Sequence, residues 1–337
     1  MDKILEGIPV LGWGRGIECT FFGSLDAALR FLKEPVNYTY LMGVSAAAFR
    51  LRFHYPEWCA SSPDAALDGT FSEAAMNAIG YKGDFIVRII EGKRAAEKMF
   101  QIIKEEINEG RPLLAIGITR IPDWGIIAGY GEDGKIICRT YYDKGENYSI
   151  AEAFPWILFR IKKEKRKKPS QKEAFLNSIK LAVELAHVKR VNHYFNGLAA
   201  YDVWIADLKN EEKFEKMNKS EFFVHWHING WIYNSLYDAR DAAVKYLKNS
   251  VKILEGNKSE KIREAAEKFE KVRETLFNNW VFFTMPHWVK GEKTWTPKQI
   301  INTNTWTPEM REKGAKALEK VKTLETEAFE ALEKIIA

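Results

Sequence analysis

Apolar residues recur at helical spacing near the start of the chain. Four of them predict one helix across residues 19–33, and they are Phe22, Leu25, Leu29 and Leu32. The same spacing predicts helices at about 72–79 and 93–109, the second ended by Gly110 and Pro112. Cys19 therefore lies at or just before the N-terminus of the first predicted helix.

Short apolar runs replace this pattern after residue 112. They cover residues 113–118, 124–130 and 135–141, and polar turns such as Asp133-Gly134 separate them. Apolar runs of this length between turn residues predict consecutive antiparallel strands. Helices followed by a strand meander predict an α+β domain, which we place at residues 1–165.

The second half of the chain is patterned for helices throughout, and we place an all-helical domain at residues 166–337. Apolar stripes run through 258–276 and 318–332, with lysine and glutamate on the opposite face. The basic run at 162–168 predicts a solvated linker. A near-repeat predicts two helix starts, with threonine as the cap and proline in the first turn: Thr294-Trp295-Thr296-Pro297 and Thr305-Trp306-Thr307-Pro308.

Composition limits the classes of function. With 337 residues, 46% of them hydrophobic, the chain can bury a core in each domain. Its net charge of +5 comes without the basic face that nucleic acid binding needs, so we expect no nucleic-acid partner. No leader and no membrane span are apparent, and three cysteines without metal-ligand spacing are typical of a reducing compartment, which predicts a cytoplasmic protein. Neither a cofactor motif nor a metal motif occurs, so we expect neither group.

Cys19 is the first candidate for chemistry. The N-terminus of a helix stabilises a thiolate over a thiol, and the thiolate is the nucleophile. A buried structural cysteine is the alternative. The order of elements favours chemistry, because a cysteine that opens a long helix, followed about a hundred residues later by an aromatic-apolar strand and a glycine hairpin, is how papain-like folds are laid out.

A family resemblance rests on these same residues. The stretch from Asp123 to Gly134, Asp-Trp-Gly-Ile-Ile-Ala-Gly-Tyr-Gly-Glu-Asp-Gly, with Cys19 upstream and Tyr142-Asp143 downstream, resembles the C39-like branch of the papain-fold cysteine peptidases. More particularly it resembles the BtrH-type N-terminal domain, over about residues 10–160. The resemblance implies a papain-like cysteine-peptidase fold with a cysteine nucleophile, a histidine base that opens the central strand, and an Asp or Asn that orients the histidine.

Two positions depart from the family pattern. The resemblance makes Cys19 the nucleophile and Asp143 the orienting residue, but the histidine position falls on Asp123. A carboxylate is a far weaker base than imidazole at neutral pH, although burial raises a carboxyl pKa. The glutamine that helps to form the oxyanion hole is replaced by Trp13, for which Arg15 or backbone N–H groups could substitute.

A polar, aromatic segment at residues 54–64 contains the nearest substitute base. Long loops with this content often carry function, and in a papain-like layout the segment could run over the cleft, which would make His54 a candidate base. A capped loop, in which Ser62 and Asp64 bond to local backbone donors, explains the same residues.

Two aromatic segments of the helical domain, 192–204 and 222–240, contain His193 and His225. They could form the second wall of a substrate cleft, or they could be aromatic core, with Asp238 and Arg240 in interhelical ion pairs. His225 and His227 diverge on a helix, which argues against zinc. The residues expected to bind substrate are Trp13, Arg15, Trp58, Trp124, His193 and His225.

The sequence therefore predicts a thiol-dependent acyl-transfer enzyme, an amidase, peptidase or acyltransferase acting on a small or peptide-like substrate. Its catalytic residues would be Cys19, Asp123, Asp143 and His54. The alternative is a catalytically inactive ligand-binding protein that kept the papain-like fold. The sequence leaves the oligomeric state open.

Overall fold

The computed structural model describes residues 2–88, 93–286, 288–290, 295–297 and 306–337. The chain divides into two compact units, and each is discontinuous in sequence. Unit 1 consists of Met1–Ser45 and Asp64–Ala174, and unit 2 of Ala46–Pro63 and Phe175–Ala337. The sequence-based division at residue 165 differs from this one, because the segment 46–63 leaves the first unit and packs within the second.

Unit 1 is built on a seven-stranded antiparallel sheet with the strand order β3-β8-β4-β5-β6-β7, and β1 pairs with β5. The strands are β1 (Lys3–Ile4), β3 (Tyr81–Val87), β4 (Leu113–Ile116), β5 (Trp124–Tyr130), β6 (Ile136–Arg139), β7 (Ser149–Ile150) and β8 (Ile157–Lys165). The predicted meander is confirmed, because β4, β5 and β6 are consecutive antiparallel neighbours.

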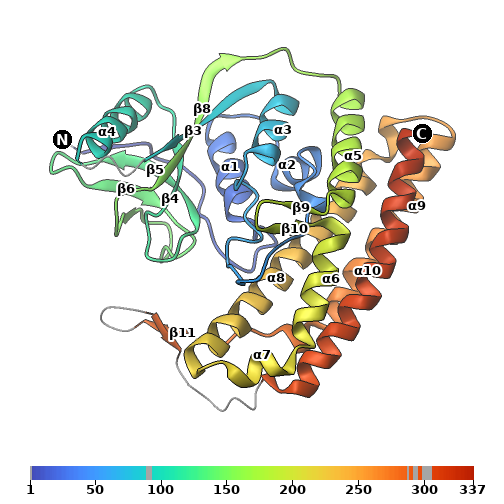
Figure 1. The fold of residues 1–337 in the computed structure, drawn as a ribbon. Coiled ribbons are helices and arrows are strands. Elements are labelled where there is room, and N and C mark those ends of the chain that lie inside the picture. The colour runs from blue at the N-terminus through green and yellow to red at the C-terminus, as the bar shows by residue number, and fades with distance from the viewer. Residues whose placement is uncertain (1, 89–92, 287, 291–294, 298–305) are drawn as a thin grey trace. The chain divides into compact units, whose positions relative to one another are not determined.

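Helices cover both faces of this sheet (Figure 1). They are α1 (Thr20–Phe31), α2 (Tyr38–Val44), α3 (Thr70–Ile79) and α4 (Lys93–Asn108). Both α1 and α4 pack against β5, which is buried along almost its whole length, as a strand covered on two faces must be. The predicted helices that begin at Cys19, near Ser72 and at Lys93 are therefore confirmed to within a few residues.

The predicted linker at 162–168 is wrong in its first half. Residues up to Lys165 belong to β8, whose partner is β3 in the register Phe85↔Phe159 and Tyr81↔Lys165. Buried Phe159 and Ile161 alternate with Arg160, which is held by Asp84 at 2.9 Å, as side chains on opposite faces of a strand do. This alternation ends at the charged run 162–165, so the continuation of the strand depends on its pairing with β3.

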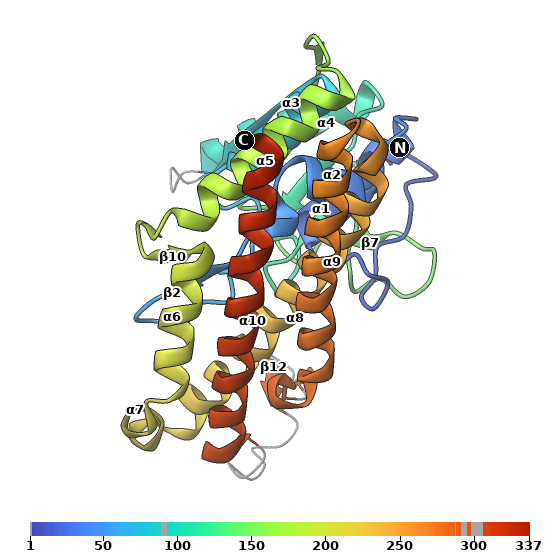
Figure 2. The ribbon, with the colours of Figure 1, turned by 90° about the vertical axis from the view of Figure 1, so that its right-hand side faces the viewer.

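Unit 2 is mainly helical (Figure 2). Its helices are most of α5 (Gln171–His187), then α6 (Gly197–Leu208), α7 (Glu211–Lys216), α8 (Lys219–Ser250), α9 (Asn257–Asn278) and α10 (Pro308–Ile336), with short 3-10 turns at Ala47–Phe49, Val251–Ile253 and Trp280–Phe283. Small sheets are formed by β2 (Arg52–His54), β10 (Tyr194–Asn196) and β9 (Arg190–Val191), and by β11 (Trp288–Lys290) with β12 (Trp295–Pro297). No helix among the described residues combines the length and apolar content of a membrane span.

The predicted helix starts of the near-repeat have different outcomes. The second is confirmed: Thr307 caps α10 by accepting a hydrogen bond from the Met310 N–H at 3.2 Å, and Pro308 follows in the first turn. The first is wrong, because Thr296 pairs with Val289 in a β-hairpin. Thr294 and Thr305 lie outside the described residues.

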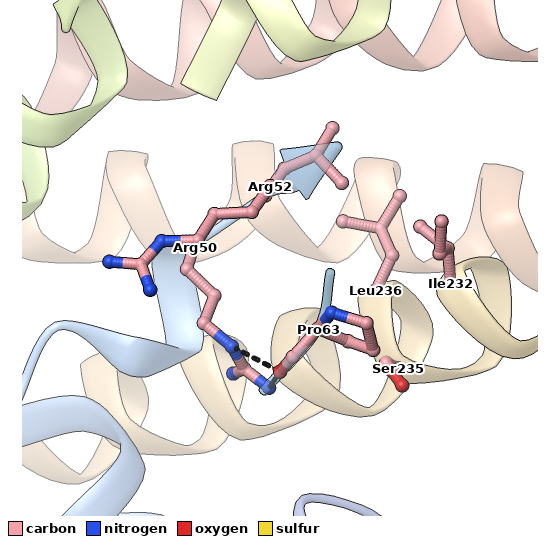
Figure 3. Close-up of a pocket in the computed structure, with 7 residues that line it drawn as sticks. Arg50, Arg52, Pro63, Ile232, Ser235 and Leu236 are labelled. Atoms are coloured by element: carbon pink, nitrogen blue, oxygen red, sulfur yellow. Dashed lines mark hydrogen bonds between the residues drawn. The ribbon is translucent and has the colours of Figure 1, made fainter. Parts of the chain in front are cut away.

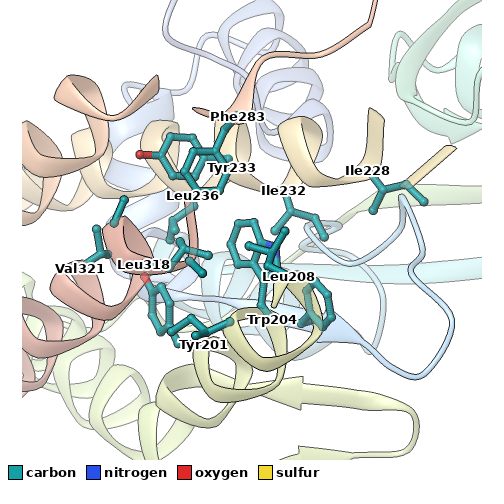
Figure 4. Packing of buried hydrophobic residues seen from close by; sticks show 14 of the residues in the cluster. Tyr201, Trp204, Leu208, Ile228, Ile232, Tyr233, Leu236, Phe283, Leu318 and Val321 are labelled. Atoms are coloured by element: carbon teal, nitrogen blue, oxygen red, sulfur yellow. The ribbon is translucent and has the colours of Figure 1, made fainter. Parts of the chain in front are cut away.

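The core of unit 2 is unusually aromatic (Figure 4). Tyr233 of α8 stacks on Phe283 with ring centroids 3.7 Å apart and an interplanar angle of 5°. Fully buried Trp204 of α6 lies against Phe283 and donates its indole N–H to Asn229 at 2.9 Å. For these residues of segments 192–204 and 222–240, the aromatic-core interpretation is confirmed.

A buried ion pair holds the segment 46–63 inside unit 2. Arg240 of α8 is completely buried, and its guanidinium makes a two-point contact with the Glu325 carboxylate of α10. The same guanidinium donates to the carbonyl oxygens of Ala48 and Arg50 at 3.0 and 2.9 Å. A buried guanidinium is stable only if its N–H groups have hydrogen-bond acceptors in the protein. The acceptors here come from α10 and from the segment 46–63, so the Arg240 side chain joins both to α8.

Candidate active site

Cys19 lies at the N-terminus of α1, as predicted. It is the N-cap residue, with an extended backbone, and it is 6% exposed. The Cys19 side chain makes no capping hydrogen bond, and the amide dipoles of the first turn are directed toward the cysteine. The backbone N–H of Cys19 itself donates to the Tyr38 hydroxyl at 3.0 Å. The dipole of α1 therefore favours the thiolate form of Cys19 over the thiol, and the Cys19 amide already has an acceptor.

Asp123 immediately precedes β5, beside the start of α1. The two elements are joined by a 3.2 Å hydrogen bond from the Trp124 N–H to the Thr20 hydroxyl, and by another from the Ser24 hydroxyl to the Trp124 carbonyl oxygen. The pKa of Asp123 is raised from 3.8 to about 6, chiefly by burial and to a smaller extent by the nearby Asp64 carboxylate, while a hydrogen bond from Tyr142 lowers it. The residue at the position where the resemblance leads one to expect a histidine is therefore a carboxyl with a pKa raised to about 6.

Tyr142 is the hydrogen-bond partner of Asp123. Its hydroxyl donates to one oxygen of the carboxylate, and burial together with the Asp123 charge raises the pKa of Tyr142, so the phenol stays protonated. Trp13 packs on the adjoining rings, 4.6 Å from Tyr141 and 6.2 Å from Tyr142 between centroids. In the sequence, Tyr142 stands out only as the neighbour of Asp143 and as a residue that follows a predicted strand.

Asp143 is bound within its own loop. One of its carboxylate oxygens accepts from the hydroxyls of Thr140 and Ser149 at 2.6 and 2.8 Å, and the other accepts from the Thr140 N–H at 3.1 Å. Its side chain is fully buried, and Arg139 lies 3.9 Å away. These bonds order the turn that follows β6, and the contact with Asp123 that was expected of Asp143 is made by Tyr142.

Trp124 and Arg15 differ in their surroundings. Trp124 is 3% exposed, its indole N–H lies 3.3 Å from both carboxylate oxygens of Asp64, and its ring lies 5.1 Å from Phe21. It is thus part of the core beneath the site, and it fixes the Asp64 charge. Arg15 is exposed and folds back over Gly12, with its Nε 3.3 Å from the place of a Cβ there.

His54 and His193 belong to unit 2, where their rings lie 5.6 Å apart. The Nδ1 atom of His54 hydrogen-bonds to the Glu57 carbonyl oxygen at 2.5 Å, and its ring lies edge-on to Tyr194. Its backbone N–H donates to Ser62, which is the local bonding that the capped-loop alternative predicts. Unit 1 contains no histidine in its sequence, so every titratable group it could use as a base near pH 6 is a carboxylate.

Trp58 and His225 also come together within unit 2, with ring centroids 5.2 Å apart. The Trp58 indole donates to Asp207 at 2.5 Å, and His225 bonds to the Glu221 carbonyl oxygen at 2.8 Å. Burial lowers the pKa of His225. Both side chains are bonded within the aromatic core of this unit, although their predicted role in substrate binding is not thereby tested.

Unit 2 also encloses a small cavity between residues 50–63 and α8 (Figure 3). Its volume is about 10 Å³, which is the room that a single water needs. The Arg50 guanidinium lies at its wall and donates to the Pro63 carbonyl oxygen at 2.8 Å. The cavity is too small for an organic substrate.

Neither a metal site nor a known family follows from these observations. Within the described part of the chain, no three side chains of His, Cys, Asp or Glu gather as metal ligands would. A scan against protein-family models and a search of curated proteins both find no match for this chain.

Proposed function

We propose that the protein is a thiol-dependent acyl-transfer enzyme, of papain-like ancestry, in which Cys19 is the nucleophile and Asp123 the base. The observation that carries this proposal is the position of Asp123 directly before β5, which the Trp124–Thr20 hydrogen bond joins to the start of α1, and the raised pKa of Asp123, about 6, supports it. Catalytic acids and bases work best when their pKa lies near the operating pH. The substrate class is a small or peptide-like acyl compound.

The raised pKa narrows the free-energy gap for proton transfer. An ordinary thiol titrates near ~8.5 and an ordinary carboxyl near ~4, so moving the proton from one to the other costs about 6 kcal/mol. With Asp123 near 6, the gap is about 2.5 pKa units, or roughly 3.4 kcal/mol. The N-terminus of α1, where Cys19 is the N-cap residue, favours the thiolate and reduces the gap further.

Each residue then has a defined role. The Cys19 sulfur attacks the acyl carbonyl while Asp123 accepts the thiol proton, and the protonated Asp123 returns it to the leaving group. Tyr142 holds the carboxylate in position, as the third member of a triad does. Because the Cys19 N–H is bonded to Tyr38, the developing oxyanion must be stabilised by other N–H groups at the start of α1.

The test is the rate of alkylation of Cys19 by iodoacetamide from pH 4 to 9, read by mass spectrometry. Cys138 is the internal control, because burial raises the pKa of its thiol to about 12 and it should not react. We expect Cys19 to react selectively, with a midpoint below ~8.5, and to form an acetyl adduct with p-nitrophenyl acetate.

The variant Asp123→Asn tests whether Asp123 acts as the base for Cys19 or only lies near it. If Asp123 assists deprotonation, the variant reacts more slowly between pH 6 and 8. If the carboxylate only repels the thiolate, the variant reacts faster, and the proposal is contradicted. An unreactive Cys19 in the unmodified protein would also contradict it.

A catalytically inactive binding protein is the second candidate. It is favoured by the absence of histidine from the sequence of unit 1 and by the 6% exposure of Cys19. For this candidate, Cys19 should titrate like an ordinary thiol and yield no acyl adduct.

A further inference from the structure

A second cavity lies in unit 1, between α3 and the edge strand β3. Its volume is about 260 Å³, far above the room for one water and near the lower limit of small-molecule sites. From α3 it is lined by Gly69, Ser72, Glu73, Met76 and Asn77, whose spacing of three and four residues places them on one helix face. From the sheet it is lined by Tyr81, Lys82, Gly83, Phe85 and Phe159, and Arg166 follows β8.

Apolar side chains line one part of the cavity. The rings of Phe85 and Phe159 lie 4.9 Å apart, and Met76 of α3 is buried. Gly83 makes this arrangement possible, since a Cβ there would lie 2.3 Å from the Phe159 ring. This part can receive an aliphatic or aromatic group.

Two side chains of opposite charge, Glu73 and Arg166, line the same cavity without forming an ion pair with each other. Glu73 makes no ion pair with any described residue. The Arg166 guanidinium donates to the side-chain oxygen of Asn77, one helical turn after Glu73, and the Arg166 N–H donates to the Gly80 carbonyl oxygen at 2.7 Å. The third charge, Lys82, is already paired with Glu164 at 2.7 Å.

We propose that this cavity binds a free α-amino acid with an apolar side chain. Residues one turn apart on a helix face have Cβ atoms about 5–6 Å apart, so a carboxylate at Glu73 and a guanidinium held at Asn77 can flank an ammonium and a carboxylate carried by one carbon atom. Arg binds a carboxylate with two parallel bonds, and Glu binds an ammonium. The side chain of the amino acid then enters the apolar part.

This site is separate from Cys19. Fully buried Phe21 has its ring 5.2 Å from Phe159 and 5.1 Å from Trp124, and Phe85 of the cavity wall lies 6.2 Å from Trp124, so aromatic rings fill the space between the cavity and the start of β5. Amino-acid binding therefore does not rest on the proposed acyl transfer. Cys19→Ser should abolish labelling at position 19 and leave amino-acid binding unchanged.

The test is isothermal titration calorimetry of the full chain with L-phenylalanine, phenethylamine and 3-phenylpropionate. L-Phenylalanine should bind at least tenfold more tightly than either analogue, because each analogue lacks one of the two charges. Glu73→Gln should weaken L-phenylalanine and phenethylamine about tenfold and leave 3-phenylpropionate unchanged. Arg166→Gln should weaken L-phenylalanine and 3-phenylpropionate in the same way. The matched control is Lys82→Gln, which removes a charge that is already paired and should change none of the three affinities.

The result that overturns the proposal is the absence of L-phenylalanine binding at millimolar concentration, or binding that neither variant weakens. Arg166 also lies near the C-terminal end of α3, where a cation stabilises a helix. If Arg166→Gln lowers the melting temperature but leaves every affinity unchanged, that structural role is its only one and the amino-acid site is refuted.

Discussion

Asp123→Asn should make the protein more stable at neutral pH and should do so in a pH-dependent way. The folded state raises the pKa of Asp123 from 3.8 to about 6, chiefly through burial. Between these two values the folded protein holds a proton that the unfolded chain has released, so stability falls as pH rises through this window. Asparagine has no charge to bury, and its side-chain oxygen can still accept the Tyr142 hydroxyl.

The magnitude follows from the size of the pKa shift. A shift from 3.8 to about 6 corresponds to about 3 kcal/mol at one pKa unit per 1.36 kcal/mol, and partial contact with solvent reduces the effect to roughly 1–3 kcal/mol. The two proteins should be nearly equal in stability at pH 4. The variant should gain steadily up to about pH 6 and keep its advantage above it.

Urea unfolding of both proteins at pH 4 to 8 measures this difference, and the ¹³Cγ NMR titration of aspartate-labelled protein measures the midpoint directly. Asp64→Asn isolates one cause, because removal of the neighbouring charge should move the Asp123 midpoint downward. A difference in stability that is flat between pH 4 and 7, or an Asp123 signal that titrates near 3.8, would refute the reasoning.

Three further predictions concern single side-chain contacts, two inside unit 1 and one inside unit 2. Tyr142→Phe should raise the NMR midpoint of Asp123, since it removes a hydrogen bond that favours the carboxylate, whereas Tyr141→Phe should leave that midpoint in place. Gly23→Ala should lower the free energy of unfolding by about 1–3 kcal/mol, because its Cβ would lie 1.9 Å from the Tyr141 hydroxyl; an unchanged urea midpoint would contradict this. Arg240→Met should cost about 3–5 kcal/mol by leaving a buried carboxylate unpaired, and thermal unfolding of the variant checks it.

Local pattern predicted most of the elements around Cys19. The helix after it, the strand at residues 124–130 and the hairpin at Asp133-Gly134 all form where the apolar spacing places them. These elements have many residues that repeat with a clear period, and the period reports which face is buried. Strands of two or three residues, such as β1 and β9, are too short for a period and were not predicted.

The candidate site was only partly predictable. The resemblance put Asp123 in the base position, and the structure provides the burial that raises its pKa. The resemblance did not predict that Tyr142 hydrogen-bonds to Asp123 or that the Asp143 carboxylate hydrogen-bonds to Thr140. Both residues follow a strand, and only the conformation of the loop decides in which direction each side chain points. The α3–β3 cavity likewise depends on the pairing of β3 with β8, which are far apart in sequence.

The sequence by itself determined where most helices and the central strands form, since hydrophobic period, caps and turn residues act over a few neighbouring positions. Only the tertiary structure decided which core each segment joins. The local sequence of residues 46–63 does not indicate that they belong to unit 2. They belong to it because Arg240 of α8 binds their carbonyl groups and because β2 pairs with β10. Such contacts join residues that are more than a hundred positions apart, and their free energy is realised only once both partners are buried together.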